Sequence, residues 1–445
     1  MKFYNRKLEL STLDKIQKKS LTTAQMTFLV GRRRIGKTKL ILQAFRKEDA
    51  YQKNFLYFFV AKKTEELLCE EYILQIEATL GIKVFGQFSQ FKLLFEYLLE
   101  LSIKQPLTIV IDEFQEFSTI NSSIYSDMQN SWDRYKDKSK INLLLCGSIY
   151  SLMIKIFENA KEPLFGRANK KIHLQPFSIT TLKEILSDNL NNKYNARDML
   201  AFYILTGGVA KYTELFVEEN ALSLESMLDY IFEVNSPFLT EGKDILIEEF
   251  GKEYTVYFSI LSLIASAKTS RSDIESILNR DVGGYLDKLD TQYNIINKVK
   301  PIFSKSGSRT QKYLIEDNFL NFWFRFIYKY RSAIEIENYQ YVKDIVKRDW
   351  DSYSGRFLEK YFIEKAKLSK KYSNIGTYWE RGNKNEIDII AINKLEKKLV
   401  LTEVKLNKTK ISIDKLKLKS QKIVEKFNGY QISYYALSLD DILQP

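Results

Sequence analysis

A glycine-bounded loop between an apolar strand and a helix start limits the N-terminal part of this chain to a few folds. The loop reads Gly31-Arg32-Arg33-Arg34-Ile35-Gly36-Lys37-Thr38 and follows the apolar run at residues 26–30. Gly31 and Gly36 permit backbone angles that turn N–H groups toward one anion, and a helix beginning at Lys37 adds the positive end of its dipole. The pattern is typical of a phosphate-binding loop. We therefore expect all eight residues to bind ATP, with Lys37 on the β and γ phosphates and the Thr38 hydroxyl on Mg²⁺.

A second segment points to the same chemistry. Residues 107–111 are continuously apolar, as expected of a strand buried on both faces of a parallel sheet, and they are followed by Asp112 and Glu113. Carboxylates at that end of such a strand lie beside a phosphate loop. We predict that Asp112 holds the Mg²⁺ through water and that Glu113 polarises the attacking water.

The first 177 residues alternate between strand and helix patterns. Their strands are expected at residues 26–30, 55–60, 107–111, 143–146 and 171–174. This alternation predicts an α/β fold, with the parallel sheet of a P-loop NTPase over residues 1–177 and helices on both faces. Residues 178–249 change to a helical pattern, which we interpret as a small helical lid.

Residues 250–317 have the outline of a winged helix. Short helices are expected at residues 254–267, 272–278 and from 284, followed by two strands with a polar tip between them. The third helix, together with Lys305 and Arg309 in the wing, can meet DNA phosphates. Winged helices also serve as plain packing between domains, and the pattern does not separate the two roles.

Residues 318–445 contain a second group of charged side chains, on two predicted strands. Alternation places Glu386 and Asp388 on one face of the first strand, and Glu403 and Lys405 on one face of the second. If these faces align, carboxylates from both strands and an ammonium converge.

Such a cluster suits a metal-dependent phosphodiesterase. Asp388 and Glu403 would ligate Mg²⁺, Glu359 on a preceding helix would add a ligand, and Lys405 would orient water or steady the developing charge. The alternative is a hairpin with one polar, solvent-facing side.

Composition excludes several other kinds of site. The two cysteines, Cys69 and Cys146, exclude a disulfide scaffold and a cysteine zinc site, and the single histidine, His173, argues against a histidine metal cluster or a serine–histidine triad. The 445 residues suggest three or four domains, and the net charge of +12 fits nucleic-acid contact as well as it fits base bias in the genome. Without an apolar run of about 18 residues, we expect a cytoplasmic protein with no membrane contact.

Several short segments along the chain together form a recognisable pattern. They are Phe3, Arg6, Glu9 and Leu10, residues 31–38, residues 111–115, Gly147-Ser148, residues 163–167 and residues 207–212. Through these segments the chain resembles the archaeal-type ATPases of the STAND branch of AAA+ proteins, which are often fused to a winged helix and a PD-(D/E)xK nuclease-like domain. For residues 318–445 the resemblance implies an α/β domain like that of restriction endonucleases. The family usually has a proline where this chain has Ala210.

The resemblance implies roles for two further residues. Ser148 would bond the γ-phosphate or the attacking water, and Arg167 would stabilise charge on the transferring phosphoryl group. The leading hypothesis is an ATP-binding, ATP-hydrolysing switch that controls a DNA-directed nuclease-like domain. The alternatives are a non-catalytic regulator that binds DNA or a protein, and a homo-oligomeric translocase in which Arg167 acts on a neighbouring subunit.

Overall fold

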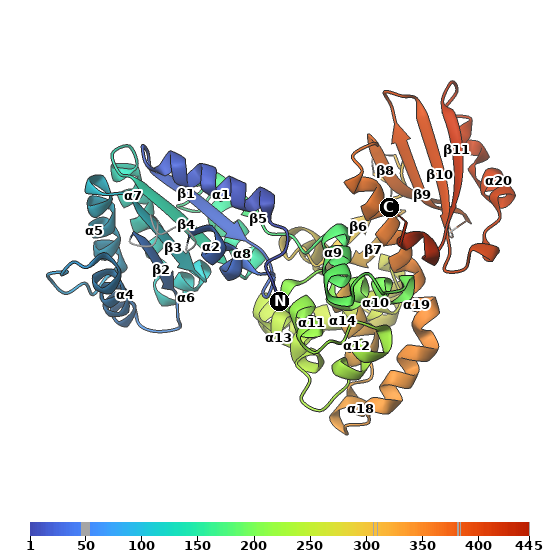
Figure 1. The fold of residues 1–445 in the computed structure, drawn as a ribbon, viewed down its shortest axis with the longest axis horizontal. Coiled ribbons are helices and arrows are strands. Elements are labelled where there is room, and N and C mark those ends of the chain that lie inside the picture. Colours follow the sequence, from blue (N-terminus) through green and yellow to red (C-terminus); the bar gives the residue numbers. More distant parts are fainter. Residues whose placement is uncertain (46–53, 306, 309, 381, 383, 445) are drawn as a thin grey trace. The chain divides into compact units, whose positions relative to one another are not determined.

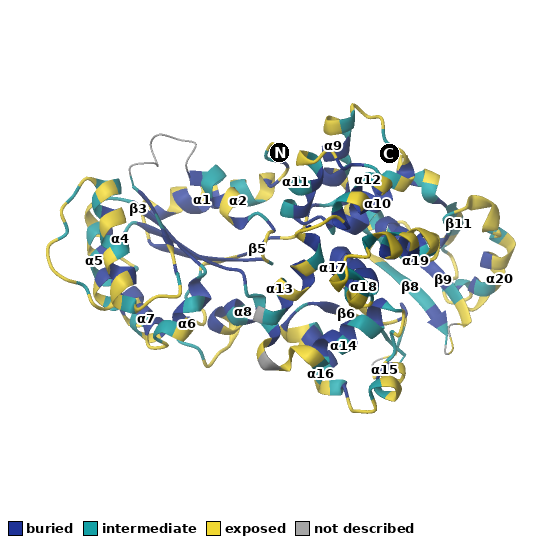
Figure 2. Cartoon of the chain, turned by 90° about the horizontal axis from the view of Figure 1, so that it is seen from below, coloured by how far each residue is buried: buried dark blue, intermediate teal, exposed yellow. Residues whose placement is uncertain are grey.

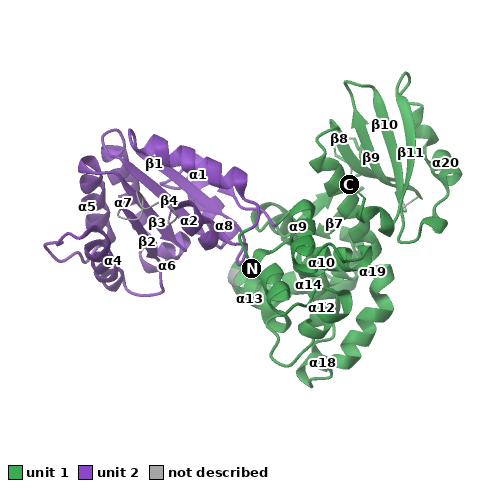
Figure 3. Cartoon of the chain, in the orientation of Figure 1, with its two compact units in different colours: residues 1–3, 177–445 green, residues 4–176 purple. Residues whose placement is uncertain are grey.

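The computed structural model divides into two compact units, which are coloured separately in Figure 3. Unit 2 comprises residues 4–176, and unit 1 comprises residues 1–3 and 177–445. The predicted lid, winged helix and C-terminal segments all lie in unit 1. The structure describes residues 1–45, 54–305, 307–308, 310–380, 382 and 384–444, without the side chains of residues 248 and 252.

Unit 2 is built on a parallel sheet, in agreement with the predicted α/β fold. Within the described residues the sheet has five strands in the order β2-β3-β4-β1-β5, and every neighbouring pair is parallel (Figure 1). Every residue of β1, β3 and β4 is buried, which explains their continuous apolar sequences. The strands are β1 (Gln25–Val30), β2 (Phe55–Phe59), β3 (Leu107–Asp112), β4 (Ile141–Gly147) and β5 (Lys170–His173).

Helices cover both faces of this sheet. Figure 2 shows α1 and α2 on one side and α6, α7 and α8 on the other, with the buried strands between them. Thr64 accepts a bond from the Leu67 N–H at the start of α4, and Gly81 ends that helix in the left-handed conformation. The helices are α1 (Lys7–Ser20), α2 (Lys37–Phe45), α4 (Glu65–Leu80), α5 (Phe91–Lys104), α6 (Phe117–Ile120), α7 (Ile124–Tyr135) and α8 (Tyr150–Glu158), and the 3-10 helix η1 (Phe114–Glu116) follows β3.

Unit 1 begins with the helices expected over residues 178–249. Side chains of Ser178, Asn195 and Ser223 accept backbone N–H bonds at three of the helix starts, so local sequence sets these boundaries. The helices are α9 (Ile179–Leu190), α10 (Ala196–Thr206), α11 (Ala210–Glu218), α12 (Leu224–Ile231) and α13 (Phe238–Phe250), followed by the 3-10 helix η2 (Gly251–Glu253).

The next elements occur in the predicted order of helices and hairpin. Strands β6 (Ile296–Val299) and β7 (Lys312–Ile315) pair antiparallel. The helices before them are α14 (Tyr254–Ala265), α15 (Arg271–Leu278) and α16 (Gly283–Asp287), which continues into the π-helix η3 (Lys288–Gln292).

The C-terminal part of unit 1 joins a helical segment to a mixed sheet. The segment comprises α17 (Asn318–Phe322), the π-helix η4 (Trp323–Tyr328), α18 (Arg331–Glu335) and the long helix α19 (Tyr339–Leu368). Most aromatic side chains of α17 and η4 are buried and serve core packing, whereas Tyr328 at the end of η4 is partly exposed. The buried ones are Phe319, Phe322, Trp323, Phe324 and Phe326.

The mixed sheet has the order β11-β10-β9-β8 in the part of the chain that the structure describes. Neighbours pair antiparallel except β10 and β11, which are parallel and joined through α20. Leu416 and Ile423 of α20 pack into the core that lines the sheet. The elements are β8 (Asn374–Glu380), β9 (Lys384–Asn393), β10 (Lys398–Val404), the 3-10 helix η5 (Lys408–Lys410), α20 (Ile413–Val424), β11 (Gln431–Leu437) and the 3-10 helix η6 (Leu439–Ile442).

None of the helices in the described ranges combines the length and the apolar character that crossing a bilayer requires.

Candidate functional site

The predicted phosphate loop runs from the end of β1 to the start of α2. A Cβ atom on Gly31 would lie 3.0 Å from the Leu174 carbonyl oxygen and 3.2 Å from the Ile35 side chain, and Gly36 has a φ of +95°. Both positions therefore need glycine, one for close backbone approach and one for its backbone angle. In this loop Ile35 is buried, Arg32 is half-buried, and Arg33 and Arg34 are exposed.

The Lys37 side chain is buried against the loop that it is predicted to serve. Its ammonium donates to the carbonyl oxygens of Gly31 at 2.8 Å and Arg32 at 3.2 Å. Burial lowers the pKa of Lys37, and the nearby charges of Glu113 and Asp112 oppose this shift. Two loop carbonyl groups therefore fix the position of the Lys37 ammonium and stabilise its charge.

Asp112 ends β3 and meets the Thr38 hydroxyl, as predicted from their positions. Its Oδ2 atom lies 3.5 Å from Thr38 Oγ1 and accepts a hydrogen bond from the Tyr57 hydroxyl, while its Oδ1 atom accepts from the Glu113 N–H at 3.0 Å. Burial and the Asp112 charge raise the pKa of Tyr57, so the phenol remains a donor. Tyr57 was not anticipated, because it is one more large residue in an apolar strand.

Glu113 and Ser148 come together because β3 and β4 are neighbours in the sheet. One carboxylate oxygen of Glu113 accepts from Ser148 Oγ at 2.7 Å, from the Ser148 N–H at 3.2 Å and from Gln115 Nε2 at 2.6 Å. The Glu113 backbone is left-handed, with a φ of +52°. Non-glycine residues in this conformation are strained and cluster at functional sites.

Arg167 does not join this group in the structure. Its guanidinium lies 3.1 Å from the Asp133 carboxylate of α7 and donates to the Phe165 carbonyl oxygen at 2.9 Å. These two contacts use only part of the five N–H donors of the guanidinium, and the role of Arg167 at the γ-phosphate stays a prediction.

Arg6 links the phosphate loop to the end of β5. The buried guanidinium donates to the Gln175 carbonyl oxygen at 2.7 Å and to the Ile35 carbonyl oxygen at 3.3 Å. Two backbone groups far apart in sequence thus share one side chain. The family pattern marked this arginine, but nothing in the local sequence identified its partners.

In unit 1, the carboxylate group predicted on β9 and β10 is assembled. Asp388 Oδ2 accepts from the Val404 N–H at 2.7 Å and lies 3.2 Å from Lys405 Nζ. The same ammonium lies 3.3 Å from Glu403 Oε1. Burial disfavours the charged form of Lys405, but the two carboxylates outweigh burial and raise its pKa, so the lysine stays charged.

Lys419 of α20 is a further member of the group that sequence reasoning missed. Its ammonium lies 3.2 Å from Glu403 Oε1 and 3.3 Å from Glu403 Oε2. Two lysines therefore contact one carboxylate. The only local signal was the helical spacing of lysines, which is common on solvated helices.

Glu359 does not complete the expected set of three carboxylate ligands. Nowhere in the described ranges do three His, Cys, Asp or Glu side chains form a group that could hold a metal ion. Burial, followed by the Asp388 charge, raises the pKa of Glu359 to about 8, so this residue is a poor anionic ligand at neutral pH. A magnesium ion at this place would have Asp388 and Glu403 as its side-chain ligands, with water filling other positions, as Mg²⁺ tolerates.

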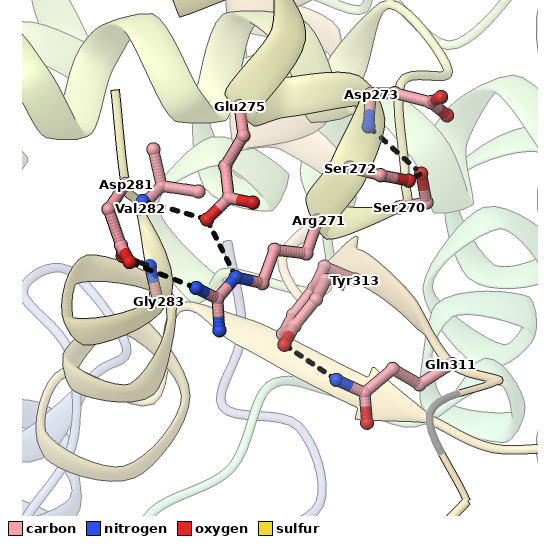
Figure 4. Close-up of polar contacts among 10 residues, drawn as sticks. All are labelled: Ser270, Arg271, Ser272, Asp273, Glu275, Asp281, Val282, Gly283, Gln311 and Tyr313. Carbon is pink, nitrogen blue, oxygen red and sulfur yellow. Dashed lines mark hydrogen bonds and ion pairs between the residues drawn. The ribbon is translucent and has the colours of Figure 1, made fainter. Parts of the chain in front are cut away.

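The elements predicted to form a winged helix use their basic residues for internal contacts. Figure 4 shows Arg271 bonded to Glu275 at 2.7 Å and to Asp281 at 3.1 Å, where it organises the turn from α15 to α16. The following helix, one of the two places where DNA contact was considered, carries Asp287 and Asp290 together with Lys288. The Asp287 carboxylate lies 3.5 Å from the Lys298 ammonium of β6.

The segment between β6 and β7 packs against the C-terminal sheet. The Ile302 N–H donates to the Thr377 carbonyl oxygen at 2.8 Å, and the Ile302 side chain joins the core of that sheet. Lys312 pairs with Glu386 at 2.9 Å. Packing, the second of the two roles left open, is therefore present for this segment. Lys305 is exposed, and Arg309 lies outside the described residues.

Comparisons with known proteins match two separate stretches of the chain. Residues 3–216 match a family described as an ATPase domain predominantly from Archaea, and residues 323–424 match a family of archaeal and bacterial proteins of unknown function. An uncharacterised protein of Methanocaldococcus jannaschii is 28% identical over 415 residues, which cover 91% of this chain and 87% of that protein.

A solved structure supports the fold. The Walker-type ATPase of Pyrococcus abyssi superposes with a TM-score of 0.53 and 18% identity, covering 72% of this chain and 96% of the other. This likeness concerns the fold alone. Together with the match over residues 3–216, it supports an ATPase domain of the P-loop class.

Proposed function

We propose that the protein is an ATP-hydrolysing switch that controls a metal-dependent, nucleic-acid-directed C-terminal domain. One observation carries the nucleotide part of the proposal. Four polar side chains lie together at the carboxyl ends of β1 and β3, beside the glycine-bounded loop. They are Lys37, Thr38, Asp112 and Glu113. Phosphate, magnesium and water each have a suitable group in this set.

The residues of unit 2 divide the work of hydrolysis. The loop N–H groups and Lys37 bind the β and γ phosphates, while Thr38 and Asp112 would hold Mg²⁺, which supplies charge neutralisation when it is bound. Glu113 orients the attacking water once its contact with Ser148 is exchanged. Tyr57 fixes the Asp112 carboxylate by donating to it.

A physical link from the nucleotide site toward unit 1 supports the switch. Arg6 bonds the Ile35 carbonyl of the loop and the Gln175 carbonyl. Unit 1 resumes at Phe177, two residues after Gln175. A movement of the loop on γ-phosphate loss would therefore reach the connection between the units.

The effector part rests on the group around Asp388. Asp388 and Glu403 would hold Mg²⁺, which supplies Lewis-acid activation of a phosphodiester when bound, and Lys405 would stabilise charge on the phosphoryl oxygens. The homo-oligomer considered above remains a separate proposal, tested by native mass measurement with and without ATP.

The nucleotide proposal is tested by calorimetric ATP binding and by phosphate release. Lys37→Ala should abolish measurable binding, whereas Lys39→Ala, at an exposed lysine two residues further along α2, should bind like wild type. Glu113→Gln should keep binding and lose hydrolysis. Equal affinity in wild type and Lys37→Ala would contradict the assignment.

The effector proposal is tested by incubating DNA and RNA substrates with the protein and Mg²⁺ or Mn²⁺. Cutting should disappear in Asp388→Ala and Lys405→Ala. It should persist in Asp414→Ala, which removes a carboxylate that is 95% exposed. A wild-type protein that cuts no form of nucleic acid would contradict the catalytic version.

A second candidate is a non-catalytic regulator that keeps the C-terminal fold as a binding module. The contact of both Lys405 and Lys419 with Glu403 favours it, because these ammonium groups compete with a metal for the carboxylate. Salt-dependent nucleic-acid binding without cleavage, unchanged in Asp388→Ala, would select this candidate.

A further inference from the structure

The positive charge of the chain is concentrated in one short segment. Residues 405–426 contain eight lysines, one aspartate and one glutamate, so they carry six of the twelve net positive charges of the chain. The segment begins at Lys405, directly after β10, and comprises the loop with η5, helix α20 and the turn after α20. A charge density of this kind attracts a polyanion.

The lysines of α20 form a stripe on one flank of the helix. Lys415, Lys419 and Lys422 are spaced by four and three residues, which places them on the same flank, and Lys426 continues the spacing in the following turn. From Lys415 to Lys422 the helix rises about 10 Å, which matches about three phosphates along one strand of a nucleic acid. We call these four residues the lysine stripe.

The lysine stripe contacts the cluster formed by Asp388, Glu403 and Lys405. Lys419, in its middle, contacts both Glu403 oxygens, and Lys422 pairs with Glu380 at 3.2 Å. Lys415 and Lys426 are exposed, and neither makes an ion pair with another described residue. Their ammonium groups are available to an external anion.

The opposite side of α20 excludes a membrane as the favoured partner. Its buried residues are Leu416, Ser420 and Ile423, and the two apolar ones pack into the core of the sheet. A helix that binds a bilayer needs a continuous apolar face left over for the lipid, and among the exposed residues of α20 Leu418 is the single large apolar one. Figure 2 shows exposed residues along α20, and these include Lys415, Lys417 and Lys422, whereas Lys419 is half-buried.

We propose that the lysine stripe of α20 binds the phosphate backbone of a nucleic acid strand and guides it to Asp388 and Glu403. The inference rests on the proposed function, because it supplies the substrate surface for that carboxylate group. It also gives the nucleic acid a contact surface outside the winged-helix elements, where Arg271 is engaged with Glu275 and Asp281.

The test is fluorescence-anisotropy binding of duplex DNA, single-stranded DNA and RNA of equal length over a range of salt concentrations, without divalent metal. The stripe variant Lys415→Gln/Lys426→Gln should bind at least about tenfold more weakly at low salt. For duplex DNA, the slope of log K against log salt is negative, and its magnitude should be smaller by about 2 in this variant, because each lost phosphate contact removes about 0.9.

A matched control removes two lysines from other surfaces of unit 1. Lys367→Gln/Lys417→Gln alters exposed residues at the end of α19 and on the opposite flank of α20, and it should bind like wild type. The charge-retaining Lys415→Arg/Lys426→Arg should also bind like wild type. It covers the case in which the glutamine variant folds poorly.

The outcomes separate this inference from the proposed nuclease. Wild-type protein that binds nucleic acid through the stripe but cuts no form of it would leave the stripe assigned and the catalysis refuted. Equal affinity and equal slopes in the stripe variant and wild type overturn the inference. Binding of wild type to phosphatidylserine vesicles but to none of the three nucleic acids overturns it as well.

Discussion

Replacing Arg6 by lysine tests the contact that joins the phosphate loop to Gln175, after β5. Arg6 also lies 3.5 Å from Glu9 Oε1, and lysine keeps the positive charge beside that carboxylate. The arginine fork reaches two carbonyl oxygens, of Gln175 at 2.7 Å and of Ile35 at 3.3 Å, from a side chain that is almost fully buried. A lysine ammonium on a shorter, unforked stem serves one of them. We expect it to keep the shorter bond to Gln175 and to leave the Ile35 carbonyl without a donor.

The size of the effect follows from that single unpaired group. A buried carbonyl left unsatisfied costs about 1–3 kcal/mol. Taking about 2 kcal/mol and the 2–4 °C per kcal/mol typical of a unit this size, the melting temperature of unit 2 should fall by about 4–8 °C. A net loss of about 1 kcal/mol in holding the loop corresponds to about fivefold weaker ATP binding.

Differential scanning calorimetry measures the first quantity. The transition that moves upward when ATP is added reports unit 2, because a ligand stabilises the part that binds it. Titration calorimetry measures the second. The control is Lys18→Gln, which breaks an exposed ion pair with Asp14 on α1, worth about 0.3–0.5 kcal/mol. If Arg6→Lys had the same melting temperature and the same ATP affinity as Lys18→Gln, the reasoning would be refuted.

Three further outcomes follow from packing and burial. Gly242→Ala places a Cβ 2.3 Å from the buried Trp323 ring and should lower the free energy of unfolding by about 1–3 kcal/mol. Gly355→Ala, in the middle of α19, places a Cβ with nothing within 4 Å and should raise the free energy of unfolding by about 0.5–1 kcal/mol. Equal unfolding free energies of the two variants in urea would contradict this. Burial and neighbouring cations lower the pKa of His173, so the only imidazole resonance in the NMR spectrum should titrate below pH 6.5, and a higher midpoint would refute the burial argument. Burial raises the folded-state pKa of Glu364 above the unfolded value of 4.5, so the ionisation of this residue lowers the free energy of unfolding as pH rises from 4.5 toward the folded pKa. The difference in unfolding free energy between Glu364→Gln and wild type should therefore grow across that pH window, and a difference independent of pH would contradict the argument.

Local patterns were enough to predict the framework of both units. The phosphate loop, the order of strands and helices in unit 2 and the hairpin of β9 and β10 follow from glycine positions and from hydrophobic periodicity. Asp112 could be placed near Thr38 because the carboxyl ends of parallel strands share one edge of a sheet. Alternation along two strands likewise brought Asp388 and Glu403 to one group.

The partners of charged side chains did not follow from these patterns. Tyr57 reaches Asp112 from a neighbouring strand, and Lys419 reaches Glu403 from a helix further along the chain. Arg167, expected at the phosphates, pairs with Asp133 in the structure. Periodicity says which face of an element a residue occupies, but not which element that face meets.

Periodicity and glycine placement are local properties, so the amino-acid order alone established where strands, helices and the phosphate loop form. The choice of partner depends on long-range packing. The insertion of Ile302 into the core of the C-terminal sheet and the bonds from Arg6 to two distant carbonyls exist only after the chain has folded. A long polar side chain has several possible neighbours, and its burial in the fold selects among them.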